Sequence, residues 1–191
     1  KVNLELHTEA AFHPHPPDHL LLLCLRGDET AGTTYALLSD VLKDLHVGIL
    51  NILKKNLFKT SVDESFRLNG EQDHSVVMPV ITRDSNNRYI MRYDKTVMTG
   101  TTTESQMALN VFTKAIERNT QTVFLKTGDL LVLDNNTTVH GRTAFQAKYD
   151  GTDRWVQRVV VSKEIDSIKN KTTCPLTGYT IITKYKEDGD E

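Results

Sequence analysis

The stretch "LELHTEAAFHPHPPDHLLLLCLRGD", residues 4–28, decides the fold of this chain. Its apolar run at 20–25 is far shorter than the roughly 20 residues that a membrane-spanning helix needs. A short apolar run of this kind predicts a buried strand. The segment 3–9 predicts a second strand, and the three prolines between the two segments indicate a loop. Two strands joined by a polar loop are therefore expected in this part of the chain.

The rest of the chain predicts more strands than helices. We expect strands at 3–9, 20–25, 75–81, 88–93, 122–126, 129–134, 154–162 and 178–184. Apolar residues recur at helical spacing over 38–53 and 107–116, and Thr103 with Gln106 forms a capping-box pattern before the second segment. Because strands and helices do not alternate regularly, we expect a mainly β fold, a sandwich or barrel with flanking helices packed outside.

Composition narrows the class of protein. The chain has 191 residues, of which 38% are hydrophobic and 25% charged, which suits one globular domain over residues 1–191. The formal net charge is −2 and the basic residues are scattered, so neither nucleic acid nor a membrane is an expected partner. Cys24 and Cys174 form no disulfide framework, which favours a reducing cytoplasm. Cys24 is expected to be a small buried hydrophobe, and the oligomeric state is left open.

A candidate metal site begins with His7 and Glu9. On a strand, side chains two residues apart point to the same face, so this pair offers an imidazole nitrogen and a carboxylate oxygen to one point. His140 is the best third ligand, because it lies in "NNTTVHGR", which we interpret as a loop after the strand 129–134. Two histidines and one carboxylate form the facial triad of non-heme Fe(II) oxygenases. Zinc hydrolases use the same donors, so a zinc site stays open as the alternative.

Two arginines mark a candidate anion site. In "DRWVQRVVV", residues 153–161, Arg154 and Arg158 are four apart and share one face of the expected strand. Apolar residues occur on both faces, which predicts that the strand is buried on both sides. Buried guanidinium groups are costly unless anions meet them, and their planar fork suits carboxylates. The site would hold two carboxylates, and internal salt bridges to Asp or Glu are the alternative.

These motifs together resemble a known family. Its signature is carried in order by "HTEAAFHPHPPDHLLLLCLRGD", "GTT" at 32–34, "RYD" at 92–94, "HGR" at 140–142 and the two arginines. The set is similar to the clavaminate-synthase-like branch of the Fe(II)/2-oxoglutarate oxygenases, which includes asparagine, arginine and lysine hydroxylases. The resemblance covers residue 4 to about residue 162. It implies a distorted double-stranded β-helix, a cupin-like form of the jelly roll.

The resemblance also implies an activity. The iron ligands would be His7, Glu9 and His140. The enzyme would use Fe(II), 2-oxoglutarate and O2 to hydroxylate an unactivated carbon of a free L-amino acid, with release of succinate and CO2. Only six residues precede His7, whereas family members carry a substantial segment there. We therefore expect this chain to be part of a longer protein and to lack its N-terminal portion.

The family pattern assigns the anion-binding residues as well. The resemblance implies that Arg154 binds 2-oxoglutarate with the help of Thr33, and Thr34 is the alternative because the register is uncertain by one residue. Arg158 would bind the α-carboxylate of the amino-acid substrate. Glu9, besides binding iron, would accept the α-ammonium group of that substrate.

The substrate side chain is less well marked. Asp94 in "MRYDKTVM" would favour a cationic substrate if it faced the pocket, and the alternatives are that it caps a turn or pairs with Arg92. The Asn-, Lys- and Thr-rich character of the chain resembles bacterial lysine hydroxylases. L-Lysine is therefore the first expectation and L-arginine the second, and an asparagine-type hydroxylase is the alternative within the family.

Overall fold

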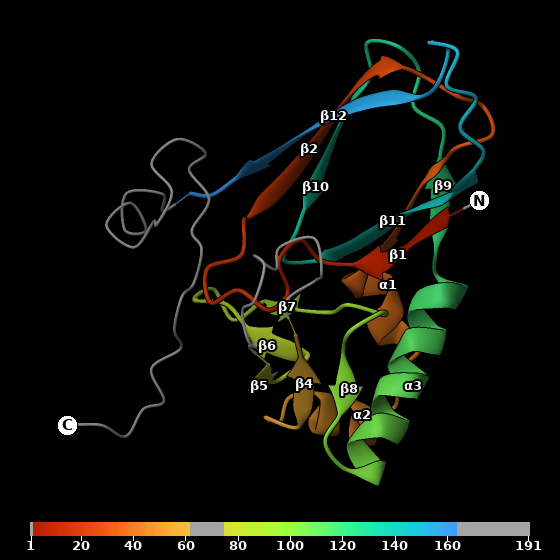
Figure 1. The fold of residues 1–191 in the computed structure, drawn as a ribbon. Helices are drawn as coiled ribbons and strands as arrows, with labels where there is room; N and C mark the ends of the chain where they lie inside the picture. Colours follow the sequence, from red (N-terminus) through yellow and green to blue (C-terminus); the bar gives the residue numbers. More distant parts are fainter. Residues whose placement is uncertain (1, 62–74, 164–191) are drawn as a thin grey trace.

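Two β-sheets form the part of the molecule that carries the candidate site (Figure 1). The computed structural model describes residues 2–61 and 75–163. The four-stranded sheet has the order β1-β11-β3-β9 and the three-stranded sheet the order β10-β2-β12, with antiparallel pairing throughout. Their strands are β1 (Val2–His7), β2 (His19–Arg26), β3 (Thr33–Leu37), β9 (Gln121–Val123), β10 (Leu130–Asp134), β11 (Thr138–Phe145) and β12 (Trp155–Val161).

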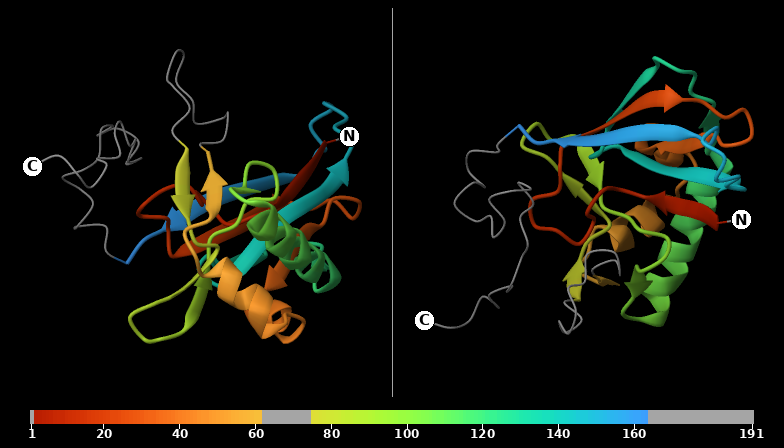
Figure 2. Two further views of the ribbon diagram at one scale, coloured as in Figure 1. Left: turned by 90° about the horizontal axis from the view of Figure 1, so that it is seen from below. Right: turned by 45° about the horizontal axis from the view of Figure 1, so that its top comes forward.

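A second layer of helices and short strands packs against the four-stranded sheet. Its elements are α1 (Leu38–Lys43), α2 (Val47–Leu53), β4 (Phe58–Thr60), β5 (Val76–Met78), β6 (Ile81–Arg83), β7 (Tyr89–Met91), β8 (Thr99–Gly100) and α3 (Thr103–Arg118). Figure 1 and the two views of Figure 2 show α1 and α3 on the face of this sheet that is turned away from the three-stranded sheet. The prediction of a mainly β fold with flanking helices is confirmed.

The main core lies between the four-stranded sheet and this second layer. Ala108, Phe112 and Ala115 of α3 recur at helical spacing and are fully buried there, as are Phe58 of β4 and Val139 of β11. Burial of each large apolar side chain contributes about 1.5–3 kcal/mol of hydrophobic free energy. The sheet that carries part of the candidate site is thus supported from behind by a packed layer.

A smaller core packs against one face of the three-stranded sheet. Leu20, Leu22 and Cys24 of β2 alternate along one face of the strand and pack with Leu125 and Leu133. Cys24 is 1% exposed, as expected of a small hydrophobe, whereas Cys174 and the strand expected at 178–184 lie outside the described residues. In the part of the chain that the structure describes, no helix is both long and apolar enough to cross a membrane.

Several expected boundaries are wrong. The helical pattern over 38–53 forms two helices, because His46 caps the start of α2 by accepting a hydrogen bond from the Gly48 N–H. The expected strand 75–81 is two strands, β5 and β6, with Pro79 between them. Helix α3 is capped by a box of Thr102 and Ser105, one residue earlier than expected.

The predicted burial of the strand 154–162 is also wrong. Trp155 of β12 is 59% exposed and Val159 is 50% exposed. Among the described elements β12 contacts mainly β2, its neighbour in the sheet, so no described layer packs over the outer face of β12. The apolar residues on its outer face therefore remain exposed in the described part of the chain.

Candidate metal centre

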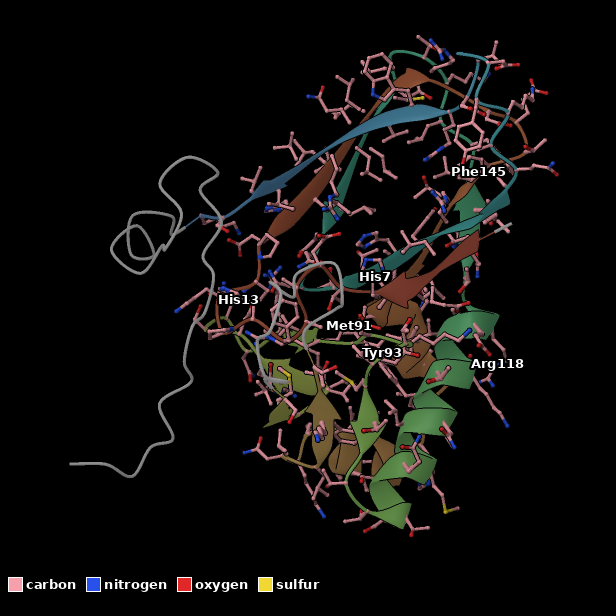
Figure 3. The ribbon with its side chains drawn as sticks, in the orientation of Figure 1. His7, His13, Met91, Tyr93, Arg118 and Phe145 are labelled. Carbon is pink, nitrogen blue, oxygen red and sulfur yellow. The ribbon has the colours of Figure 1, made fainter. Side chains whose placement is uncertain are left out.

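The two histidines of the candidate site meet across a pair of strands. His7, the last residue of β1, is the direct partner of His140 in the antiparallel β1–β11 ladder. Their ring centroids lie 4.4 Å apart, and Figure 3 shows His7 at the end of β1 beside β11. The expected loop around His140 is wrong, because this residue lies inside β11. The ladder of the four-stranded sheet, rather than a loop, positions both imidazoles.

A glycine allows the two strands to approach each other. A Cβ atom placed on Gly141 would lie 2.5 Å from the carbonyl oxygen of Leu4 and 2.9 Å from Thr34 Oγ1. Any larger residue would push β1 away from β11 at the position next to His140. The glycine of the "HGR" motif is thus required by the close packing beside the site.

Glu9 completes the cluster although it lies beyond the end of β1. Its Oε1 atom is 3.7 Å from His7 Nε2 and 3.3 Å from His140 Nε2. Ligand atoms of all three residues lie within 4.8 Å of one another. Glu9 and His140 are buried, and His7 is half-buried. The expected strand 3–9 therefore ends two residues early, but the structure still brings the three predicted side chains together.

The electrostatics of the cluster favour an anionic carboxylate. Burial alone would raise the pKa of Glu9, but hydrogen bonds with His140 and His7 and the charge of Arg158 hold this pKa well below its ordinary value. Burial lowers the pKa of His140, and the charges of His7 and Arg158 add to that effect. Burial lowers the pKa of His7, but hydrogen bonds with the Glu9 carboxylate and the Glu5 carbonyl raise it by more. The pKa of His7 is therefore above its ordinary value.

The tautomer of His7 is fixed by its backbone neighbour. His7 Nδ1 lies 2.8 Å from the carbonyl oxygen of Glu5. Because a carbonyl oxygen can only accept, Nδ1 must carry the proton and the lone pair of the neutral ring lies on Nε2. This is the nitrogen that faces Glu9.

The separations of these donor atoms fit a metal ion. Two donors bound at right angles to a metal, with bonds of about 2.1 Å, lie about 3 Å apart. The observed separations of 3.3 Å and 3.7 Å are close to that value. His7, Glu9 and His140 could therefore hold one ion from one side, as in a facial triad.

Arg158 contacts the carboxylate of the cluster. Its Nη1 donates to Glu9 Oε1 at 3.0 Å and to Glu9 Oε2 at 3.2 Å. The Arg158 side chain is 48% exposed, so the guanidinium group is only half withdrawn from solvent. This contact is the internal ion pair that the sequence left open, and it places Arg158 directly beside the three candidate ligands.

Arg154, the residue before β12, contacts Thr33 of β3 in the other sheet. Arg154 Nη2 donates to Thr33 Oγ1 at 3.0 Å, and Thr33 is 2% exposed. Thr34 points to the other face of β3, because successive side chains on a strand alternate. Burial lowers the pKa of Arg154, and the charge of Arg142 lowers it further.

Sequence reasoning gave Arg142 no role. Arg142 pairs with Thr33 in the β3–β11 ladder and follows His140 by two residues, so it shares the face of β11 that carries the site. The alternation of side chains along a strand could have placed Arg142 beside His140. The segment was expected to be a loop, so this alternation was not applied to it.

Asp94 occupies a turn next to the cluster. Its Oδ1 atom accepts hydrogen bonds from the backbone N–H groups of Thr96 at 2.8 Å and Val97 at 3.2 Å. Asp94 also forms an isolated antiparallel bridge with His7. The geometry is that of the turn-capping alternative, and a contact with substrate stays a prediction.

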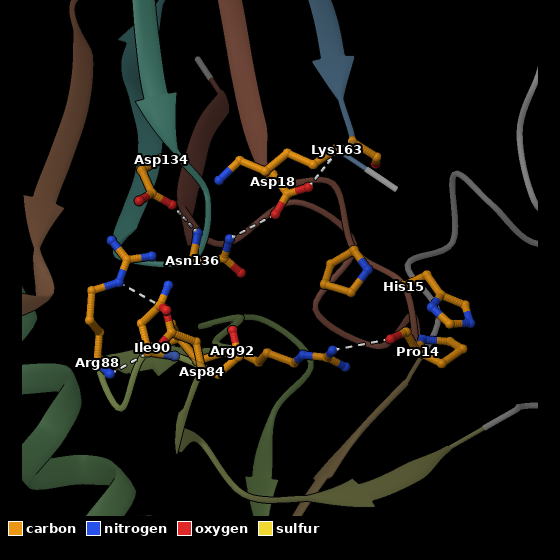
Figure 4. Close-up of a pocket in the computed structure, with 14 residues that line it drawn as sticks. Pro14, His15, Asp18, Asp84, Arg88, Ile90, Arg92, Asp134, Asn136 and Lys163 are labelled. Carbon is orange, nitrogen blue, oxygen red and sulfur yellow. Dashed lines mark hydrogen bonds and ion pairs between the residues drawn. The ribbon is translucent and has the colours of Figure 1, made fainter. Parts of the chain in front are cut away.

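Residues other than His7, Glu9 and His140 line a polar hollow of about 350 Å³ (Figure 4). His15 lines it, together with residues of the β6–β7 hairpin and the end of β10. Within it, Arg88 Nε donates to Asp84 Oδ2 at 2.8 Å, and Asp18 Oδ2 accepts from the Lys163 backbone N–H at 2.7 Å. Several polar groups of this hollow are therefore already bonded within the chain.

Comparisons with known proteins agree with this geometry. Residues 1–160 match the family model described as taurine catabolism dioxygenase TauD, TfdA family. The L-asparagine oxygenase of Streptomyces coelicolor is 35% identical over 93% of this chain and 53% of the relative. The L-lysine 3-hydroxylase of Catenulispora acidiphila is 32% identical over 82% of this chain and 45% of the relative.

A solved structure gives the same result. An asparagine oxygenase in complex with Fe(II), 2S,3S-3-hydroxyasparagine and succinate superposes with a TM-score of 0.82 at 34% identity, over 90% of this chain and 54% of that one. The chain thus spans about half the length of the relatives that it matches. The resemblance to the amino-acid hydroxylases is confirmed, and the chain belongs to the TauD/TfdA dioxygenase family.

Proposed function

We propose that this protein is an Fe(II)- and 2-oxoglutarate-dependent hydroxylase of a free L-amino acid, with succinate and CO2 as co-products. The observation that carries the proposal is the convergence of His7, Glu9 and His140 within 4.8 Å. When bound, Fe(II) and 2-oxoglutarate would supply the oxygen activation and the electrons that convert a C–H bond into C–OH. The two antiparallel sheets are consistent with a double-stranded β-helix, which we propose as the fold.

The protein residues have distinct tasks in this proposal. Glu9 is anionic and offers the charged oxygen ligand, while His7 and His140 offer neutral nitrogen ligands. The hydrogen bond from His7 Nδ1 to the Glu5 carbonyl orients the His7 ring and increases its basicity as a ligand. The two-strand ladder holds both rings before any ion binds, so little reorganisation is needed.

We assign the co-substrate to Arg154 and Thr33. A carboxylate of 2-oxoglutarate can accept hydrogen bonds from a guanidinium group and from a hydroxyl group. The contact between Arg154 and Thr33 already places both donors together at 3.0 Å. Arg142, whose charge acts on Arg154, adds positive potential for the same anion.

The substrate would bind as a zwitterion. Arg158 would take the α-carboxylate of the amino acid, and the neighbouring Glu9 would lie near the α-ammonium group. In the structure Arg158 donates to Glu9 itself, so a substrate carboxylate would share or replace this contact. Positioning of the amino acid in this way would aim one of its C–H bonds at the metal and exclude water.

The substrate side chain is polar or basic. L-Lysine, expected first from the sequence, and L-asparagine, which names the more similar relative, are supported equally, with L-arginine after them. Asp94 gives no added weight to a cationic substrate, because its Oδ1 caps a turn. The zinc hydrolase alternative is supported only by the donor set of His7, Glu9 and His140. It does not account for the contact between Arg154 and Thr33.

Mass spectrometry on a panel of L-amino acids tests this proposal. The full-length protein would be incubated with Fe(II), 2-oxoglutarate and air, and the products analysed for a gain of one oxygen atom and for succinate. We expect one amino acid to be hydroxylated in a ratio of one to one with succinate. Zn(II) in place of Fe(II) should abolish both products. No hydroxylated product with any member of the panel would contradict the proposal.

A further inference from the structure

We propose that Asn135 is a positioning residue that holds Glu9 at the metal centre. The inference rests on the proposed function in one respect, since it takes His7, Glu9 and His140 as ligands of one ion. Asn135 lies in the turn between β10 and β11 and is 3% exposed.

Glu9 needs such a partner because the strand ladder does not reach it. The pairing of β1 with β11 ends at His7 and His140, and Glu9 follows in a turn. The next residue, Ala10, has a φ angle of 49°, in the left-handed region. A residue other than glycine keeps this conformation only when surrounding contacts hold it.

The carboxamide of Asn135 takes the place of the missing neighbouring strand. The Glu9 N–H donates to Asn135 Oδ1 at 2.7 Å, and Asn135 Nδ2 donates to the Glu9 carbonyl oxygen at 3.2 Å. One side-chain amide thus satisfies both peptide groups of Glu9, as an opposing residue in a sheet would. Because these groups are buried, water does not readily replace the contacts.

Asn135 also joins Glu9 to the segment that leads into β11. Asn135 Nδ2 also donates to the Pro17 carbonyl oxygen at 2.9 Å, and the Asn135 N–H donates to the Asp18 carbonyl oxygen at 2.9 Å. Five residues later, the strand that begins after this turn carries His140. The backbone of one candidate ligand is therefore fixed to the turn that leads into the strand of another, which keeps the Glu9 carboxylate in register with His140.

Binding of Co(II) as a probe metal tests this role without turnover. Calorimetric titration and the visible absorption of bound Co(II) would be measured under anaerobic conditions on the full-length protein, on Asn135→Ala and on Asn135→Asp. We expect Asn135→Ala to weaken Co(II) affinity by roughly 10–100-fold and to change the absorption spectrum. Asn135→Asp keeps the acceptor for the Glu9 N–H but places an oxygen beside the Glu9 and Pro17 carbonyl oxygens, so it should also weaken Co(II) binding.

Two control variants separate positioning from general destabilisation. Asn136→Ala alters the neighbouring residue of the same turn, whose side chain contacts Asp18 and not Glu9. Phe112→Leu lowers stability from the core under the four-stranded sheet, where the Phe112 ring packs edge-on against Tyr93. Both should bind Co(II) with the affinity and spectrum of the parent protein.

The outcomes distinguish this inference from the proposed function. If both Asn135 variants keep the affinity and spectrum of the parent, or if Phe112→Leu weakens Co(II) binding as much as Asn135→Ala does, the positioning role is wrong. If the parent protein itself binds no Co(II), the metal centre, the proposed function and the positioning role of Asn135 are all wrong.

Discussion

His7 and His140 are direct partners across the β1–β11 ladder, with ring centroids 4.4 Å apart. A strand pair fixes the distance between opposing side chains much more tightly than a loop does. The four-stranded sheet therefore sets the distance between the two candidate histidine ligands, and variants that disturb the sheet should disturb metal binding as well.

Gly141→Ala should separate the two strands. The new methyl group would meet the Leu4 carbonyl oxygen at 2.5 Å, and backbone atoms cannot rotate away as a side chain can. We expect a loss of about 1–3 kcal/mol in the free energy of unfolding, measured by denaturant titration, and weaker metal binding. Gly48→Ala, where the nearest atom is His46 Nδ1 at 3.3 Å, should change stability by less than about 1 kcal/mol. Equal stability of Gly141→Ala and the parent would refute the close packing.

Arg154→Ala should weaken the binding of 2-oxoglutarate. A hydrogen bond to a charged group contributes about 1.5–3 kcal/mol, so the KM for 2-oxoglutarate should rise roughly 10–100-fold. Thr33→Val removes the hydroxyl that contacts Arg154 and should raise the same KM by a smaller factor. Thr34→Val is the matched control and should leave this KM close to that of the parent. A similar effect of both threonine variants would mean that the assignment of Thr33 is wrong.

Arg158→Ala should act on the amino acid and not on the co-substrate. We expect the KM for the amino acid to rise at least about tenfold, because a charged hydrogen bond to its α-carboxylate is lost. The KM for 2-oxoglutarate should change little, which separates this variant from Arg154→Ala. Steady-state kinetics with each substrate varied in turn would measure both values. An unchanged KM for the amino acid would place its carboxylate elsewhere.

Ionisation of Tyr93 should lower the free energy of unfolding at high pH. Burial raises the pKa of Tyr93 to about 12, although its hydrogen bond with Thr113 opposes the shift. A raised folded-state pKa means that the stabilisation is complete below the unfolded value of about 10 and is lost as the pH rises towards 12. The free energy of unfolding should therefore fall more steeply over this range in the parent than in Tyr93→Phe. Parallel pH profiles of the two proteins would contradict the assignment.

Local patterns in the sequence predict part of this molecule. The spacing of His7 and Glu9, the apolar alternation of β2 and the periodicity of α3 correspond to features of the structure. Turn-forming residues made β11 hard to predict, because Asn135 and Asn136 lie in the turn before it and Gly141 lies within it. Propensity indicates a loop there, whereas pairing with β1 and β3 makes the segment a strand.

Other features depend on contacts that a single segment cannot reveal. Alternation along β12 shows that it has two apolar faces, but only the contacts of the folded chain show that no described layer packs over its outer face. The orientation of Asp94 is set by two backbone N–H groups of its own turn. The role of Asn135 depends on three segments that meet only in the folded chain.

Metal binding by His140→Ala is the most direct test of the metal centre. Calorimetric titration of the full-length protein with Fe(II) under anaerobic conditions should give one ion per chain. His140→Ala should weaken that binding at least tenfold and abolish the formation of succinate, while thermal unfolding shows that the metal-free variant is still folded. If His140→Ala binds Fe(II) as tightly as the parent and retains turnover, then His7, Glu9 and His140 do not share one ion.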